Sequence, residues 1–201
     1  MKASSSTTRT SRASAVAVNP SRSESVVQAG RLDQNHFALL GLTPAFQIDL
    51  QQLEGARQRV QSVVHPDRFA SAGSAQKRLA LQWSTRIHEA YETLREPLKR
   101  AVYLLELKGC SVDAEQNTRM PLEFLEQQME WREALESARA ATGAARDQAL
   151  ATLKGACTDA QSHGLDRLAS LLSQDSPEAL SAAAAQVRAL MFIEKFSEEL
   201  R

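Results

Sequence analysis

Apolar residues recur at every third or fourth position after Asp49, the spacing that places them on one face of a helix. Asp49 is a suitable N-cap for this helix. Pro66 disfavours the helical conformation of the residue before it, so we expect the helix to end at about His65. The predicted apolar face comprises Leu50, Leu53, Ala56, Val60, Val63 and Val64.

A second helix with the same periodicity is predicted to begin at Ser74, after a loop over residues 69–73. Two amphipathic helices joined by a short loop are expected to pack as an antiparallel pair. The turn that contains His65 and Asp67 then projects from one end of the pair. The apolar face of the second helix comprises Leu79, Trp83, Ile87, Ala90, Tyr91 and Leu94.

Shorter helices flank this pair. One is expected between Asp33, as N-cap, and Gly41, where a glycine can end it. The other should begin at Pro97 and end at Gly109. We expect Leu98, Ala101, Val102, Leu104 and Leu105 to point inward, and Lys99 and Arg100 outward. Together these helices predict a first domain over residues 31–110.

The remaining chain predicts three more helices, separated by glycine and proline. The first covers residues 121–141 and ends before Gly143, and the second runs from residue 144 to about His163, next to Gly164. The third follows Pro177. Their apolar residues are Met120, Phe124, Leu125, Met129, Leu135 and Ala138, then Leu150, Leu153 and Cys157, then Leu180, Ala184, Val187, Leu190, Met191 and Phe196. They predict a small three-helix bundle over residues 119–201.

Composition and charge support an all-α protein and narrow its partners. Aromatic residues are scarce, at 5%, and helix-forming residues are plentiful. The 24 basic residues balance the 24 acidic ones, which argues against nucleic acid or an anionic membrane as a partner. No apolar run is long enough to span a bilayer. Cys110 and Cys157 form no Cys-x-x-Cys pair, which argues against a disulfide framework and favours a reducing compartment.

Residues 1–30 are rich in Ser, Thr, Ala and Arg and lack helical periodicity, so we expect a disordered extension. The same composition resembles a mitochondrial transit peptide. We therefore expect a cytoplasmic protein, with the mitochondrial matrix as the alternative.

Catalytic and metal-binding patterns are absent from the sequence. There is no Gly-x-Ser-x-Gly elbow and no glycine-rich phosphate loop, so we expect neither an enzyme nor a cofactor. The four histidines, His36, His65, His88 and His163, do not share a metal-ligand spacing, and no metal is expected. His163 is most simply a cation at a helix C-terminus.

The exposed turn over His65, Pro66 and Asp67 is the strongest candidate for function. On its own, an imidazole beside a carboxylate is consistent with a catalytic pair, a metal-ligand pair or a protein-docking point. Set between two helices with complementary apolar faces and followed by Arg68 and Phe69, it resembles the J domain. That module engages a heat-shock chaperone of the seventy-kilodalton class and triggers its ATP hydrolysis.

Further stretches resemble one J-protein family, the HscB co-chaperones of iron-sulfur cluster assembly. They cover both proposed domains and are residues 36–42, 64–70, 90–105, 124–133 and 187–192. The resemblance implies an L-shaped protein with an N-terminal J domain and a C-terminal three-helix bundle. It also implies two partners, an HscA-type heat-shock chaperone and an IscU-type scaffold protein on which clusters are assembled.

The resemblance also implies which residues contact each partner. The chaperone-binding positions are His65, Pro66 and Asp67, and J domains usually add a basic face, for which this chain offers Arg57, Arg59 and Arg68. Arg57 stands where the family more often has an aromatic core residue. The scaffold-binding positions are Leu125, Met129, Glu130, Glu133 and Phe192.

Helical spacing is compatible with the scaffold-binding set but does not establish it. Leu125, Met129 and Glu133 are successive single turns apart, so one stripe can combine apolar contact with an acidic rim. The alternative is that Leu125 and Met129 belong to the core. If Met191 is buried, Phe192 should lie at the rim, since adjacent helical residues point about 100° apart.

The expected function is therefore delivery of the scaffold to the chaperone and stimulation of the chaperone ATPase, which aids cluster transfer. A general J protein that presents other clients through its second domain is the alternative. A metal-binding or hydrolytic enzyme that uses His65 and Asp67 is a third hypothesis, which metal analysis of the purified protein would test.

Overall fold

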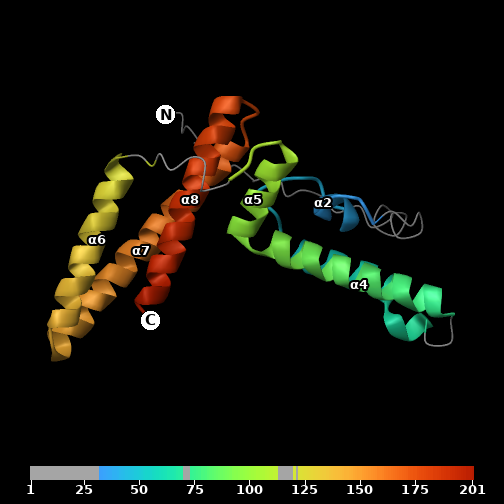
Figure 1. Ribbon diagram of the computed structural model, residues 1–201, viewed down its shortest axis with the longest axis horizontal. Helices are drawn as coiled ribbons and strands as arrows, with labels where there is room; N and C mark the ends of the chain where they lie inside the picture. The colour runs from blue at the N-terminus through green and yellow to red at the C-terminus, as the bar shows by residue number, and fades with distance from the viewer. Residues whose placement is uncertain (1–31, 70–72, 113–119, 121) are drawn as a thin grey trace, which may run out of the picture.

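The computed structural model describes residues 32–69, 73–112, 120 and 122–201, and all regular structure among these residues is helical. The predicted all-α class is therefore confirmed for the described part of the chain. The helices form two arms that meet at an angle, which is the expected L shape (Figure 1). The extension predicted over residues 1–30 lies outside the described residues. Among the described helices, none combines the length and hydropathy that a membrane span requires.

The first arm is built on α3 (Leu50–Val64) and α4 (Ser74–Arg95), which pack against each other and are joined through the short 3-10 helix η1 (Pro66–Phe69). The short helix α2 (His36–Leu39) packs on α4, and α5 (Pro97–Leu107) follows α4 directly. As predicted, Asp49 caps α3, because its Oδ1 accepts a hydrogen bond from the Gln51 N–H at 2.8 Å. The core of this arm includes Phe37, Leu53, Ala56, Val60, Trp83, Ile87, Ala90 and Leu94.

Two expectations about the apolar faces of α3 and α4 are wrong. Leu50 and Leu79 were assigned to these faces, yet they are 53% and 45% exposed. The buried residues of each helix cover a narrower arc than the apolar residues of the sequence. At about 100° per residue, Leu50 and Leu79 fall roughly 60–75° from the centre of that arc.

Two further expectations about the ends and faces of short helices are wrong. The N-cap of α2 is Asn35 and not Asp33, since the Asn35 Oδ1 accepts a hydrogen bond from the Ala38 N–H at 2.8 Å. Arg100 does not point outward from α5. It is 6% exposed, and its Nη1 donates a hydrogen bond to the Leu94 carbonyl oxygen at 2.8 Å.

The second arm is a three-helix bundle of α6 (Leu122–Ala140), α7 (Gly143–Leu172) and α8 (Pro177–Glu199). The helix α7 packs against both α6 and α8. Ser176 caps α8, because its hydroxyl oxygen accepts a hydrogen bond from the Ala179 N–H at 3.1 Å. The buried residues of the bundle include Trp131, Leu135, Leu153, Cys157, Leu168, Val187, Leu190 and Phe196.

The helix α7 runs through His163 and Gly164, so the predicted break at Gly164 and the helix C-terminal position of His163 are both wrong. Gly164 is a contact point between α7 and α8. A Cβ atom added there would lie 2.6 Å from Cδ2 of Leu190 and 2.9 Å from Nε2 of Gln186. The glycine therefore allows close helix packing and does not end the helix.

The two arms meet where α5 packs against α8 and, to a smaller extent, α7 (Figure 1). Lys108, just after α5, forms an ion pair with Asp175, just before α8. Close by in sequence, the Cys110 thiol donates to the Leu180 carbonyl oxygen, with a sulfur-to-oxygen distance of 3.7 Å. These contacts hold the N-terminal end of α8 against the C-terminal end of α5.

Candidate functional site

The turn that follows α3 places His65 and Asp67 together at the free end of the first arm. The helix stops at Val64, and His65 leaves it with an extended ψ of 130°. The Asp67 N–H donates a hydrogen bond to His65 Nδ1 at 3.3 Å, and the Asp67 Oδ2 lies 3.6 Å from the same nitrogen. The His65 side chain is 49% exposed and that of Asp67 91% exposed.

This geometry determines what the turn offers to a partner. Because Nδ1 of His65 accepts the Asp67 N–H, a neutral His65 ring carries its proton on Nε2. The turn therefore presents one N–H donor and one carboxylate to solvent. Within the described residues, no group of three or more His, Cys, Asp or Glu side chains is arranged to hold a metal ion. An exposed donor beside an exposed carboxylate suits contact with another protein.

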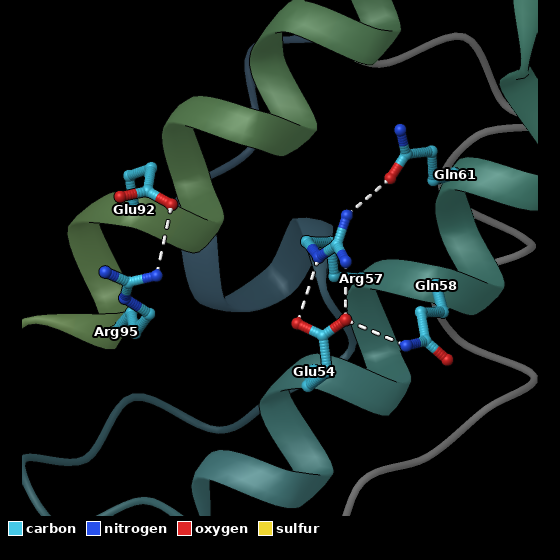
Figure 2. Close-up of polar contacts among 6 residues, drawn as sticks. All are labelled: Glu54, Arg57, Gln58, Gln61, Glu92 and Arg95. Atoms are coloured by element: carbon cyan, nitrogen blue, oxygen red, sulfur yellow. Dashed lines mark hydrogen bonds and ion pairs between the residues drawn. The ribbon is translucent and has the colours of Figure 1, made fainter.

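Arg57, one of the predicted basic contacts, lies over the α3–α4 seam (Figure 2). Its Nε donates to Glu54 Oε2 at 3.1 Å and its Nη1 to Gln61 Oε1 at 2.7 Å. Its guanidinium carbon lies 5.0 Å from the centre of the Tyr91 ring. Arg57 thus occupies the edge of the core through a cation–π contact, and its charge is balanced by Glu54.

The carboxylate of Glu54 shows how strongly this charge is balanced. Hydrogen bonds donated by Arg57, Gln58 and Tyr91 lower the pKa of Glu54 to about 2. The same ion pair raises the pKa of Arg57. A second guanidinium, that of Arg95, has its carbon 5.9 Å from the centre of the Tyr91 ring. Arg95 also pairs with Glu92 at 3.8 Å (Figure 2). A role for Arg57 in docking remains a prediction.

The structure describes the other two predicted basic contacts, Arg59 and Arg68, in less detail. Nη1 of Arg59 lies 3.3 Å from the position that a Cβ atom of Gly55 would occupy, so Arg59 folds back along α3. Arg68 belongs to η1, but its side chain lies outside the described residues, as does that of Pro66. The structure therefore brings His65 and Asp67 together and leaves the basic contacts as predictions.

On α6, the alternative that Leu125 and Met129 are core residues is wrong. The buried residues of this helix are Trp131, Leu135 and Ala138, whereas Leu125 and Met129 are 42% and 65% exposed. At about 100° per residue, Met129 lies roughly opposite Trp131. The helix thus has one apolar face toward the bundle and another apolar face toward solvent.

Phe192 lies at the edge of the core, as expected, but the assumption that Met191 is buried is wrong. Met191 is 45% exposed and Phe192 is partly buried. The buried face of α8 passes through Val187, Leu190, Ile193 and Phe196 in steps of three, which turns Met191 outward. The ring of Phe192 meets Phe124 edge-on, with 5.7 Å between ring centres, and thus lies against α6.

The predicted scaffold-binding residues do not all lie on the same side of α6. Leu125 and Met129 are about 40° apart around the helix, and Glu133 is about 40° further on. Glu130 is exposed but points away from Phe192, because Phe192 contacts Arg132 and residues 130 and 132 lie about 160° apart. Helical position therefore places Leu125, Met129 and Glu133 along one exposed stripe of α6. Phe192 lies to one side of this stripe, against Phe124 and Arg132.

Sequence reasoning missed two neighbours of this group. Leu122 is 69% exposed, and the guanidinium carbon of Arg132 lies 6.0 Å from the centre of the Phe192 ring. Leu122 precedes Met129 by two turns and therefore shares its face, which is a signal that the sequence contained. Arg132 could not be found this way, since its contact is with another helix.

Comparison with known proteins places the chain in a family. Residues 120–201 match a family described as the HSCB C-terminal oligomerisation domain. A co-chaperone protein HscB homolog of Paraburkholderia phymatum is 50% identical over 84% of this chain and 93% of its own length. Among solved structures, chaperone HscB from Vibrio cholerae is 37% identical, covers 83% of this chain and 95% of its own, and has a TM-score of 0.70. Human co-chaperone HscB is 26% identical, covers 84% of this chain and 81% of its own, and has a TM-score of 0.74. By the extent and identity of these matches, the chain belongs to the HscB co-chaperone family.

Proposed function

We propose that this co-chaperone delivers an IscU-type iron-sulfur scaffold protein to an HscA-type heat-shock chaperone and stimulates the chaperone's ATP hydrolysis, which aids cluster transfer. The observation that carries the proposal is the separation of two exposed sites on two arms. One site is the His65–Asp67 turn, and the other is the outward face of α6, with the partly buried Phe192 of α8 beside it. A protein with two such sites can hold two partners at once.

The chaperone-facing site acts through binding and not through covalent chemistry. The Nε2–H of His65 and the carboxylate of Asp67 supply one hydrogen-bond donor and one charge. Stimulation requires that these groups bind more tightly to the chaperone state that leads to hydrolysis than to its resting state. Pro66 stiffens the turn by restricting its own φ.

The scaffold-facing site has the features of a protein interface. Leu125 and Met129 are exposed apolar side chains, and the exposed Glu133 lies one turn from Met129. Apolar contacts flanked by acidic residues favour a partner with a complementary apolar patch and basic rim. The contacts between α5 and α8 keep the two arms, and so the two partners, in a defined arrangement.

We also propose that the protein acts in the cytoplasm. The 50% identical relatives are bacterial, which supports this compartment over the mitochondrial matrix. Neither cysteine is part of a disulfide, as suits a reducing compartment.

The test is the steady-state ATPase rate of the chaperone, measured with and without scaffold. The intact protein should stimulate hydrolysis, and scaffold should increase the effect synergistically. His65→Gln should abolish stimulation while scaffold binding persists, with His88→Gln, another exposed histidine, as control. Met129→Ala should preserve stimulation without scaffold and lose the synergy, with the similarly exposed Leu81→Ala as control.

Two outcomes contradict the proposal in different ways. Normal stimulation by His65→Gln would show that the turn does not engage the chaperone. If the stimulated ATPase rate is the same with and without scaffold, and the protein binds denatured proteins broadly, it is a general J protein instead.

A further inference from the structure

Phe192 is part of a row of four aromatic rings that joins α8 to α6. Its centre lies 5.7 Å from that of Phe124 on α6, in an edge-to-face arrangement, and 6.1 Å from that of Phe196, nearly parallel. Phe196 stacks in turn on Trp131 of α6, with 5.5 Å between centres. Phe196 and Trp131 are buried, so this row fixes the inner side of Phe192 and leaves its outer side at the surface.

Arg132 supplies a contact to Phe192 from the solvent side. Its guanidinium carbon lies 6.0 Å from the centre of the Phe192 ring, within the range of a cation–π interaction. Its Nη1 also lies 3.8 Å from Oε2 of Glu199, near the end of α8. Arg132 therefore reaches from α6 to α8 twice, once to the ring and once to the carboxylate.

The charge of Arg132 stands out on this helix. Between residues 122 and 138 it is the only basic residue, among Glu123, Glu126, Glu130, Glu133 and Glu136. Glu136 follows it by one helical turn and could attract the guanidinium away from the ring. The pair with Glu199 opposes that movement. The cation beside Phe192 is thus held by a partner on the neighbouring helix.

We propose that Arg132 is a positioning residue of the scaffold-binding site: it holds the Phe192 ring in the orientation that the scaffold contacts, and Glu199 holds Arg132. This inference rests on the proposed scaffold-binding function. When the scaffold excludes water from the site, the attraction between the guanidinium and the ring becomes stronger, since cation–π contacts gain when desolvated. Arg132 therefore contributes to scaffold affinity through Phe192.

The experiment is a double-substitution cycle in the full-length protein, with scaffold affinity measured by calorimetry. Arg132→Gln should raise the Kd for scaffold by about three- to tenfold, and Arg132→Lys, which keeps the charge, by less. In a Phe192→Leu background, Arg132→Gln should have almost no further effect. Glu199→Gln should produce a smaller loss than Arg132→Gln.

The control is Arg139→Gln, which removes the same charge from an exposed position on the same helix. It should leave the Kd unchanged, and Arg132→Gln and Arg139→Gln, which replace exposed side chains, should keep the thermal unfolding temperature of the unsubstituted protein. In the free protein, the NMR shifts of the Phe192 ring protons should change with Arg132→Gln and not with Arg139→Gln. A general structural role for Arg132 would not move these ring shifts selectively.

Two binding results would overturn this inference and leave the proposed function standing. One is an unchanged Kd for Arg132→Gln, and the other is the same fold-change in the Phe192→Leu background as in the unsubstituted protein. Failure of the unsubstituted protein to bind scaffold would instead overturn the proposed function, and would leave the ring shifts as evidence of the Arg132–Phe192 contact only.

Discussion

Nη1 of Arg100 donates a hydrogen bond to the main-chain carbonyl oxygen of Leu94 across 2.8 Å, inside the core of the first arm. In a continuous helix this carbonyl would accept the N–H four residues further on, but α4 ends at Arg95 and Pro97 begins α5. Arg100 thus satisfies a carbonyl left without its helical partner. Its guanidinium also lies 5.4 Å from the centre of the Phe46 ring, and burial lowers its pKa to about 10.

Arg100→Met should destabilise the protein because it leaves the buried Leu94 carbonyl without this donor. Loss of a hydrogen bond from a charged donor should lower the free energy of unfolding by about 2–3 kcal/mol. Urea denaturation followed by circular dichroism measures this difference. Lys99→Met, at an exposed neighbouring position, should change stability by less than about 0.5 kcal/mol. Equal stabilities for the two variants would contradict the role given to Arg100.

Features fixed by local chemistry were predictable from the sequence, as the ends of α3 show. Asp49 caps this helix and Pro66 ends it through interactions with residues next to them. Arg100 was misplaced because charged side chains ordinarily point outward, and no local pattern reveals an unpaired carbonyl on the preceding helix. The same reason applies to Gly164, whose neighbour Leu190 is distant in sequence.

The same distinction between local and long-range contacts separates the predicted from the missed features of the candidate sites. The His65–Asp67 turn depends on residues two positions apart, so the sequence predicted it. Helical spacing left Leu125 and Met129 undecided, because α6 is apolar on two faces and only packing selects the buried one. Arg132 was missed since its contacts are on α8.

Two glycines in α7 should respond oppositely to alanine. Alanine favours a helix over glycine by about 1 kcal/mol, so Gly155→Ala, where nothing lies within 4 Å of the added Cβ, should stabilise the protein by about 0.5–1 kcal/mol. Gly164→Ala should destabilise it by about 1–3 kcal/mol, since the Cβ meets the buried Leu190 side chain at 2.6 Å. Chemical denaturation of the two variants checks the signs. A stabilising Gly164→Ala would mean that α7 and α8 can separate at little cost.

His36 should make the first arm sensitive to mild acid. Its side chain is buried and lies against the Tyr103 ring in a tilted arrangement, with 4.2 Å between ring centres. Burial, and secondarily the nearby Arg86 charge, lowers its pKa below the usual 6.5, although Glu89 partly opposes this. The unfolded chain therefore binds a proton at a higher pH than the folded protein does. Stability is then lost as pH falls below 6.5 toward the folded-state pKa.

The check is the free energy of unfolding of the unsubstituted protein and of His36→Phe at about pH 7.5 and about pH 5.5. The substitution keeps an aromatic ring and the backbone N–H that bonds to the Tyr103 hydroxyl at 2.8 Å. The unsubstituted protein should lose more stability over this interval than His36→Phe. An equal loss in both proteins would assign the acid sensitivity to other groups.

Glu54 should contribute a second acid transition at lower pH. Its pKa falls from 4.5 to about 2 in the folded protein because Arg57, Gln58 and Tyr91 donate hydrogen bonds to its charged form. A carboxyl whose folded-state pKa is lowered adds stability above its unfolded-state pKa, and this contribution is lost as pH falls from 4.5 to about 2. Since the group is partly exposed, the contribution is small and best measured as a difference between variants.

Thermal unfolding of Glu54→Gln, recorded between pH 5 and pH 2 as a window of about three pH units, isolates this contribution. The variant should show a weaker dependence of Tm on pH than the unsubstituted protein, and the two curves should converge at the acid end. Glu106→Gln removes an exposed carboxylate from α5 and should run parallel to the unsubstituted protein. Parallel curves for Glu54→Gln as well would mean that Arg57 is held at the α3–α4 seam by the Tyr91 ring and not by Glu54.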